Sequence, residues 1–370
     1  MDSNITFGIW GGTCLIINSV CSRVFLNFPR QIIEVAGSAA WMIVIYIFTI
    51  MLILFSLIQK LFSKFEGKDI IDISEEAMGN VGRVIVGTLI ILLLFSIGCI
   101  ILREYSENMK TIALADSPIG FVSWFFLAGM AFGAFLGIEP LVRFHSLAVP
   151  LIVSTFLFIV LAVMPYYDSS NFAPWLGNGP TKILGSGFFS TSIFSPILYL
   201  FLIPPFIKTN KNFKIIGYLG ISICAFLLFV SVVTYTSVYH YPTSLESFLP
   251  TFQLARLINF ERFFERIESV FMLAWAASAL LYLSIIMFFI LYTFKKTFKL
   301  QYYKPLIFIS TILLFNLSLL PPNLISAIDL EVKYYSRLSL IITLLLPLLV
   351  AFIGNIRQRK KVNNNNEKNH

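Results

Sequence analysis

The chain has 370 residues, of which 58% are hydrophobic and only 12% are charged, and its formal net charge is +8. An average soluble domain holds roughly 45–50% apolar and about 25% charged residues. This chain is too apolar to hide its surface in one water-surrounded core, so the bilayer must be its solvent. The composition excludes a soluble enzyme, a secreted disulfide scaffold and a disordered regulator. We expect the excess positive charge to report orientation in the membrane and not a nucleic-acid partner.

Ten apolar segments follow along the chain, and most reach the roughly 17–25 residues that a helix needs to cross a bilayer. They cover residues 5–35, 39–61, 84–102, 119–136, 147–164, 188–207, 213–235, 270–294, 306–320 and 338–356. The first segment is interrupted, and the ninth is short and ends at two prolines. We therefore predict an all-α membrane protein of about ten spanning helices.

Three further stretches complete the expected organisation. Residues 65–78 predict an amphipathic helix on the inner face, and residues 249–264 predict a helix along the outer surface. The membrane domain is expected to end at residue 356. Residues 357–370 are basic and rich in asparagine, which predicts a disordered tail.

Lysine and arginine set the expected orientation. If the N-terminus is cytoplasmic, these residues are about twice as frequent in the inner loops and tail as in the outer loops. This bias predicts that both termini lie in the cytoplasm, with an even number of spanning helices.

No pattern of catalytic, metal-binding or cofactor-binding residues stands out. The four cysteines lie in apolar segments without CxxC spacing, which predicts free thiols. Zinc-protease, phosphate-loop and nucleophile-elbow motifs are missing from the sequence, and the three histidines are isolated. We therefore expect no enzyme and no cofactor. Acidic residues fall outside the centres of the predicted spans, which argues against a simple proton relay.

The interruption of the first segment is the most informative feature. Asn18, Ser19, Ser22 and Arg23 interrupt an apolar run that resumes before Pro29. Small polar residues at mid-membrane can leave backbone groups unpaired, and a cavity, a neighbouring helix or a ligand must then satisfy them. The sequence predicts a broken helix with a ligand site. The alternative is that these side chains bond their own helix or a neighbour.

The sixth segment carries a matching defect, Ser190-Thr-Ser-Ile-Phe-Ser-Pro196. Pro196 removes a backbone donor and clashes with the preceding turn. A proline kink used only for packing explains this defect equally well. Two defects at corresponding positions of two five-helix halves favour a binding site between them.

Polar residues in two other spans are candidates for a cavity wall. They are Ser96 and Cys99 in the third, and Ser278, Tyr282, Ser284 and Phe288 in the eighth. Ordinary packing between helices is the simpler interpretation of each of them.

Several motifs, in order along the chain, resemble one known family. They are Arg23-Val-Phe-Leu-Asn-Phe-Pro29 with Ala36-Gly-Ser-Ala-Ala-Trp41, Gly137-Ile-Glu139 with Arg143-Phe144, Asn171-Phe-Ala-Pro174, and Phe248-Leu-Pro-Thr-Phe-Gln-Leu-Ala-Arg256. Together they resemble the endospore germination permeases, the GerAB/GerKB-type B subunits of germinant receptors, in the amino acid–polyamine–organocation superfamily.

The resemblance implies a LeuT-like fold, a 5+5 inverted repeat with helices 1 and 6 broken. It implies a small germinant, commonly an amino acid, held between helices 1, 3, 6 and 8. Ser22, Ser284 and Phe288 take family pocket positions, and Ser96, Cys99, Phe194 and Ser195 align more loosely. The implied partners are an A-type membrane subunit and a C-type lipoprotein in the spore inner membrane.

The chain departs from the family pattern at three places. Ser22 replaces a common glycine, Phe194-Ser195-Pro196 replaces a frequent acidic residue, and Tyr282 replaces a frequent lysine. These differences leave ion coupling and the identity of the ligand open. Three functions therefore stand at this point: a germinant sensor, an amino-acid permease and a scaffold that anchors partner subunits.

Overall fold

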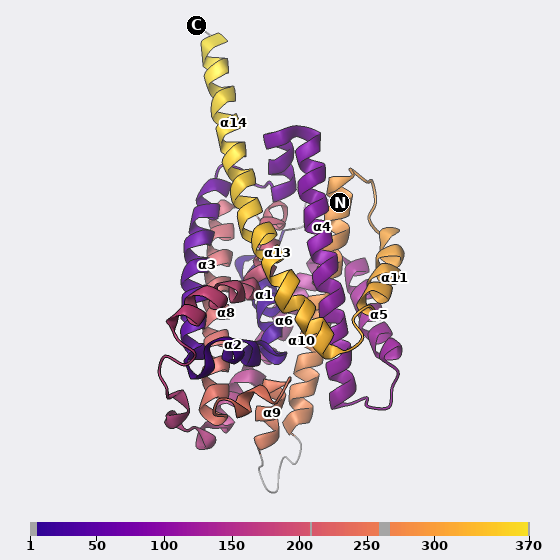
Figure 1. Ribbon diagram of the computed structural model, residues 1–370. Coiled ribbons are helices and arrows are strands. Elements are labelled where there is room, and N and C mark those ends of the chain that lie inside the picture. Colours follow the sequence, from indigo (N-terminus) through magenta and orange to yellow (C-terminus); the bar gives the residue numbers. More distant parts are fainter. Residues whose placement is uncertain (1–5, 208, 259–266, 369–370) are drawn as a thin grey trace.

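The computed structural model describes residues 6–207, 209–258 and 267–368, and every regular element in these ranges is helical (Figure 1). The main helices are α1 Ile9–Cys21, α2 Phe28–Ala36, α3 Ala40–Phe62, α4 Ile70–Ile112, α5 Ile119–Leu136, α6 Ile138–Ala162, α7 Gly187–Phe189, α8 Asn210–Val238, α9 Pro250–Leu257, α10 Ile267–Thr297, α11 Leu306–Ser318, α12 Leu324–Leu330, α13 Ser336–Leu340 and α14 Leu346–Lys368.

Eight helical stretches of the described residues are long and apolar enough to cross a membrane, and α11 and residues Ile9–Phe25 are shorter apolar helices. The bounds of α5 are those predicted. By contrast, α4 continues ten residues beyond its predicted end, and the last spanning stretch, Leu324–Arg359, begins well before residue 338. Both extensions contain charged residues that face the protein interior and not lipid, so an apolar window cuts them off.

Helix α1 forms the centre of the bundle. Residues Gly11 to Cys21 are all buried. Glycines allow the close approach to α8, since a Cβ at Gly12 would lie 2.7 Å from Ile216 and one at Gly220 would lie 3.0 Å from Ile16. The second central helix, α10, packs against α4, α5 and α6. Polar groups on α1 therefore face other protein elements and not lipid.

The first spanning segment is broken at Ser22, inside the predicted interruption of residues 18–23. Helix α1 continues through Asn18 and Ser19 to Cys21, and a 3₁₀ turn, η1, covers Ser22–Phe25. Leu26 leaves helical geometry with ψ −144°, and α2 restarts with a proline in its first turn. Pro29 has no N–H to continue the ladder, so the chain restarts a helix there. Ser19 stays helical because its hydroxyl donates to the Leu15 carbonyl of its own helix at 2.7 Å.

The sixth segment changes its winding several times. A π-helical turn, η5, covers Lys182–Ser186, then α7 follows, and a 3₁₀ helix, η6, runs over Ser190–Phe201 with Pro196 inside it. Runs of 3₁₀ helix longer than three or four residues are uncommon. The predicted defect at Ser190 to Pro196 is therefore a change from α to 3₁₀ winding that lasts for twelve residues.

The peripheral stretches complete the fold. Asp69 caps α4, and a bend at Gly79 (φ 75°) separates Ile70 to Met78 from the long part of the helix, in agreement with a separate helix over residues 65–78. Helix α9 agrees with the start of the outer helix, and residues 259–264 of that prediction lie outside the described residues. Helix α14 runs from Leu346 to Lys368 and includes most of the predicted tail.

Candidate functional site

A buried charged cluster lies at the break of the first segment. Arg23 in η1 is only 5% exposed, and its Nη1 forms an ion pair with Glu331. Glu331 opens η9, the π-helical turn Glu331–Tyr335 of the last spanning stretch. The guanidinium carbon of Arg23 lies 5.8 Å from the centre of the Tyr335 ring. The break is thus tied to the last spanning stretch by a charge pair and an aromatic face.

Two more contacts connect this pair to the other broken elements. The Gln31 amide of α2 donates to the second oxygen of Glu331 at 3.4 Å. The hydroxyls of Ser195 in η6 and Tyr335 lie 3.0 Å apart. The break of helix 1 and the 3₁₀ helix η6 therefore both contact the last spanning stretch at η9.

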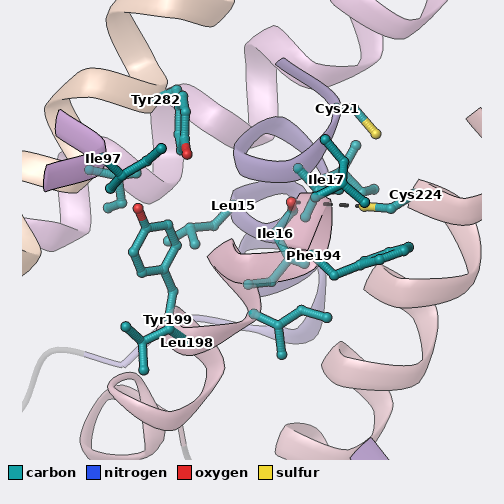
Figure 2. Close-up of a cluster of buried hydrophobic side chains, with 14 of the residues drawn as sticks. Leu15, Ile16, Ile17, Cys21, Ile97, Phe194, Leu198, Tyr199, Cys224 and Tyr282 are labelled. Atoms are coloured by element: carbon teal, nitrogen blue, oxygen red, sulfur yellow. Dashed lines mark hydrogen bonds between the residues drawn. The ribbon is translucent and has the colours of Figure 1, made fainter. Parts of the chain in front are cut away.

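A second carboxylate faces the same cluster. Glu104 of α4 is 1% exposed and lies close to Arg23 and Glu331. Four buried tyrosines, Tyr105, Tyr199, Tyr282 and Tyr335, surround the three charges. Figure 2 shows the hydroxyl ends of Tyr199 and Tyr282 facing one another beside α1. Two carboxylates and one guanidinium make a strongly polar centre in an otherwise apolar bundle.

A cavity of about 90 Å³ borders the ion pair. Its walls come from α2, from the start of the sixth segment and from η9, and Arg23, Gln31 and Glu331 are among them. The ion pair therefore forms part of the wall of this cavity.

The predicted residues of helices 1 and 8 form a second polar contact. The Asn18 amide donates to the Ser278 carbonyl at 3.1 Å, and the Ser278 hydroxyl donates to the Asn18 side-chain oxygen at 2.8 Å. Beside them lies a cavity of about 20 Å³, which Ser22 also lines. This volume holds about one water molecule, so an amino acid needs α1 or α6 to move before it can enter there.

The other predicted residues are dispersed. Ser195 reaches the charged cluster through Tyr335, whereas Ser19 bonds its own helix. Figure 2 shows Phe194 beside Cys224, in the packing around α1. The structure also places Ser96 and Cys99 in a separate groove between α4 and the last stretch, Ser284 against α5 and Phe288 against Phe206 and Tyr292. These four do not meet the residues at the break, and their role in ligand binding stays a prediction.

Sequence reasoning missed Arg23, Glu104 and Glu331 as site residues. Glu104 and Glu331 lie outside the centres of the predicted spans, yet both are buried inside long helices. Both residues lie outside the apolar segments predicted from the sequence, because each segment was ended where charged residues begin. Arg23 could have indicated the site from the sequence, since it lies inside an apolar segment. A charged side chain in such a segment needs a partner of opposite charge.

Comparison with known proteins agrees with the resemblance seen in the sequence. A family model described as "Spore germination protein" matches residues 10–324. Spore germination protein KB of Bacillus subtilis (strain 168) is 26% identical over 245 residues, which cover 65% of this chain and 66% of that protein. Spore germination protein YndE of the same organism is 24% identical over 205 residues, covering 54% and 55%. The chain therefore matches just under two thirds of the first relative and about half of the second.

Two solved transporter structures share the fold. One is a substrate-bound, outward-open Na⁺-coupled sialic acid symporter, with a TM-score of 0.63, 13% identity and coverage of 95% of this chain and 88% of that one. The other is MhsT in complex with L-phenylalanine, with a TM-score of 0.68, 12% identity and coverage of 93% and 87%. Both have the LeuT fold, and the chain adopts it too. At such low identity the likeness concerns the fold alone.

Proposed function

Because the chain belongs to the spore permease family of germination proteins, we propose that it is the germinant-sensing membrane subunit of a spore germinant receptor. It binds a small nutrient, an amino acid, between helices 1, 3, 6 and 8. These helices are α1 with α2, α4, the sixth segment, and α10. The observation that carries the proposal is the buried cluster of Arg23, Glu104 and Glu331 at the break of helix 1, with a cavity that borders the ion pair between Arg23 and Glu331.

The broken segments give binding a route to signalling. A ligand shifts a conformational equilibrium only by binding one state better than the other. The ion pair between Arg23 and Glu331 and the bond between Ser195 and Tyr335 join η1, η6 and η9 at one point. A ligand that changes these contacts therefore changes how three segments pack, and partner subunits sense the new packing.

The partners we propose are an A-type membrane subunit and a C-type lipoprotein, with the complex in the spore inner membrane. Both termini lie in the cytoplasm. Figure 1 draws the start of α1 and the end of α14 at the same end of the bundle, which supports this orientation together with the lysine and arginine bias.

Deleting the gene tests this function. Spores that lack the chain should form normally but lose the germination response to at least one nutrient, and re-expression of the intact chain should restore it. Normal germination of the deletion strain with every single nutrient would refute the proposal.

A working amino-acid permease is the second candidate, because both solved relatives by fold are transporters. Uptake of radiolabelled amino acids into liposomes that contain the purified chain separates the two functions. A pure sensor gives no uptake above empty liposomes, whereas a permease accumulates its ligand.

A further inference from the structure

A groove of about 370 Å³ lies between α4, the end of α11 and the last spanning stretch, and its walls are mainly apolar and aromatic. Ser96 and Cys99 also line it, but the Ser96 hydroxyl donates to the Leu92 carbonyl of its own helix at 2.8 Å. Apolar cavities stay dry, and an empty one loses van der Waals contacts along its walls. The groove is therefore suited to a hydrocarbon chain.

The rim of the groove opens to the surroundings of the protein. Leu320 is 73% exposed and Tyr334 is 70% exposed, and Tyr334 belongs to a stretch long and apolar enough to cross a membrane. Because the bilayer is the solvent of this chain, apolar side chains exposed at this level contact lipid. An acyl chain can enter the groove from the side, without passing through the bundle.

A second cavity, of about 390 Å³, adjoins one end of the groove and carries charged side chains. Four residues line both cavities: Leu320, Pro321, Leu330 and Tyr334. The second cavity adds Ser326, Asp329 and Lys333. Charged side chains are costly at the centre of the bilayer, and tyrosines gather where hydrocarbon meets the headgroups. This end of the groove therefore lies at the level of the lipid headgroups.

Asp329 and Lys333 present opposite charges one helical turn apart. Their side chains form an ion pair of 2.8 Å, and both are more than half exposed. An ion pair this exposed contributes little to stability, so each partner can exchange it for a charged headgroup at little cost. A headgroup with a phosphate and a primary ammonium group matches both charges, because Lys333 donates to the phosphate and Asp329 accepts from the ammonium. A purely anionic headgroup pairs with Lys333 but is repelled by Asp329.

We propose that the groove and the adjoining cavity form a binding site for one phosphatidylethanolamine molecule of the bilayer. One acyl chain lies in the groove, and the headgroup lies between Lys333 and Asp329. The site goes beyond the proposed function and does not depend on it. Tyr335 lines the groove, and its hydroxyl lies 3.0 Å from that of Ser195 while its ring lies 5.8 Å from the guanidinium carbon of Arg23. The bound lipid thus packs against a residue that also contacts the charged cluster.

The test uses the purified full-length chain in nanodiscs that hold phosphatidylethanolamine, phosphatidylglycerol and phosphatidylcholine in equal amounts and with the same acyl chains. The chain is released into mild detergent, and native mass spectrometry counts the lipids that stay bound and identifies each headgroup by its mass. The wild type should retain one phosphatidylethanolamine molecule in preference to the other two lipids, because only this headgroup combines a phosphate with a primary ammonium group.

Two variants test the headgroup contacts. Lys333→Gln should lower the retention of phosphatidylethanolamine about 10-fold, as expected when one charge-assisted hydrogen bond is lost. Asp329→Asn should shift the preference toward phosphatidylglycerol, because it removes the carboxylate that repels an anionic headgroup. The matched control is Arg143→Gln, which breaks another exposed pair one turn apart, with Glu139 at 2.6 Å, and it should retain lipid as the wild type does.

A third variant tests the groove itself. Leu338→Trp places a larger side chain in the groove and should lower retention of the lipid whatever its headgroup. Leu349→Trp is the matched control, since Leu349 lies on the same spanning stretch outside the groove and is 45% exposed, against 43% for Leu338. It should retain lipid as the wild type does.

Three results would overturn the inference. They are a wild type that retains no phosphatidylethanolamine in excess or prefers phosphatidylglycerol, headgroup variants that behave as Arg143→Gln does, and a Leu338→Trp variant that behaves as Leu349→Trp does. If Leu338→Trp does not fold, the two headgroup variants at the surface decide the question alone.

Discussion

Replacing Arg23 by glutamine should destabilise the protein more than replacing Glu331 by glutamine, although the two residues form one ion pair. Without Arg23, two buried carboxylates lose their only cation in the cluster. Without Glu331, the guanidinium still has Glu104 close by. The asymmetry follows from the two-to-one ratio of carboxylates to guanidinium.

The expected sizes follow from the burial of the three groups. Removing one partner of a buried ion pair costs about 3–5 kcal/mol, which applies to Arg23→Gln. Glu331→Gln should cost about 1.5–3 kcal/mol, the loss of one hydrogen bond to a charged group. With a shift of roughly 2 °C per kcal/mol for a chain of this size, the unfolding temperature should fall by about 6–10 °C and about 3–6 °C, respectively. In the double variant the two effects should fall short of additivity by about 0.5–3 kcal/mol.

Thermal unfolding of the four proteins in the same nanodiscs, at one scan rate, measures these differences. The scan rate is fixed because membrane proteins often unfold irreversibly. Equal losses for the two single variants, or strict additivity in the double variant, would show that Arg23 does not hold the two carboxylates together.

The same assay checks three other sites. Gly217→Ala should cost about 1–3 kcal/mol, because its Cβ would lie 1.9 Å from a ring carbon of Phe55, whereas Gly185→Ala, with nothing within 4 Å, should be neutral. Asn18→Ala should cost about 1–3 kcal/mol, because the reciprocal bonds to Ser278 are lost. Asp69→Ala should cost about 1–2 kcal/mol, because α4 loses its cap and its contacts with the end of α10.

Each of these predictions has a contradicting outcome. Equal stability of the two glycine variants would mean that α3 and α8 are packed less tightly than described. A neutral Asn18→Ala would show that the bonds between α1 and α10 do not hold the helices together. A neutral Asp69→Ala would show that other contacts hold the start of α4.

Much of the fold was predictable because apolar runs and helix-ending residues dominate it. Helix α5 has the predicted bounds, since Gly137 follows it directly with φ 94°, a backbone angle that favours glycine. Arg30 with Glu34 and Glu139 with Arg143, each one turn apart in the sequence, form ion pairs of 3.5 and 2.6 Å. These features depend only on residues close together in the sequence, so the sequence alone is enough to predict them.

The charged cluster was not predictable in the same way. Glu104 and Glu331 are 227 positions apart, and only the folded bundle shows that both face Arg23. Hydropathy treats every charge as a reason to end a span, because it measures contact with lipid. It carries no information on a charge that faces another helix. The continuation of α1 through Asn18 had a similar cause, since Ser278 bonds the Asn18 side chain from another helix.

The long 3₁₀ helix η6 is more extended than an α-helix with the same number of residues. A 3₁₀ helix rises about 2.0 Å per residue, whereas an α-helix rises about 1.5 Å. If all twelve residues of Ser190–Phe201 rewound to α geometry, the segment would shorten by about 6 Å. A change of pitch inside one segment would thus pull its two ends toward each other across the bundle, with no hinge and no rigid-body rotation.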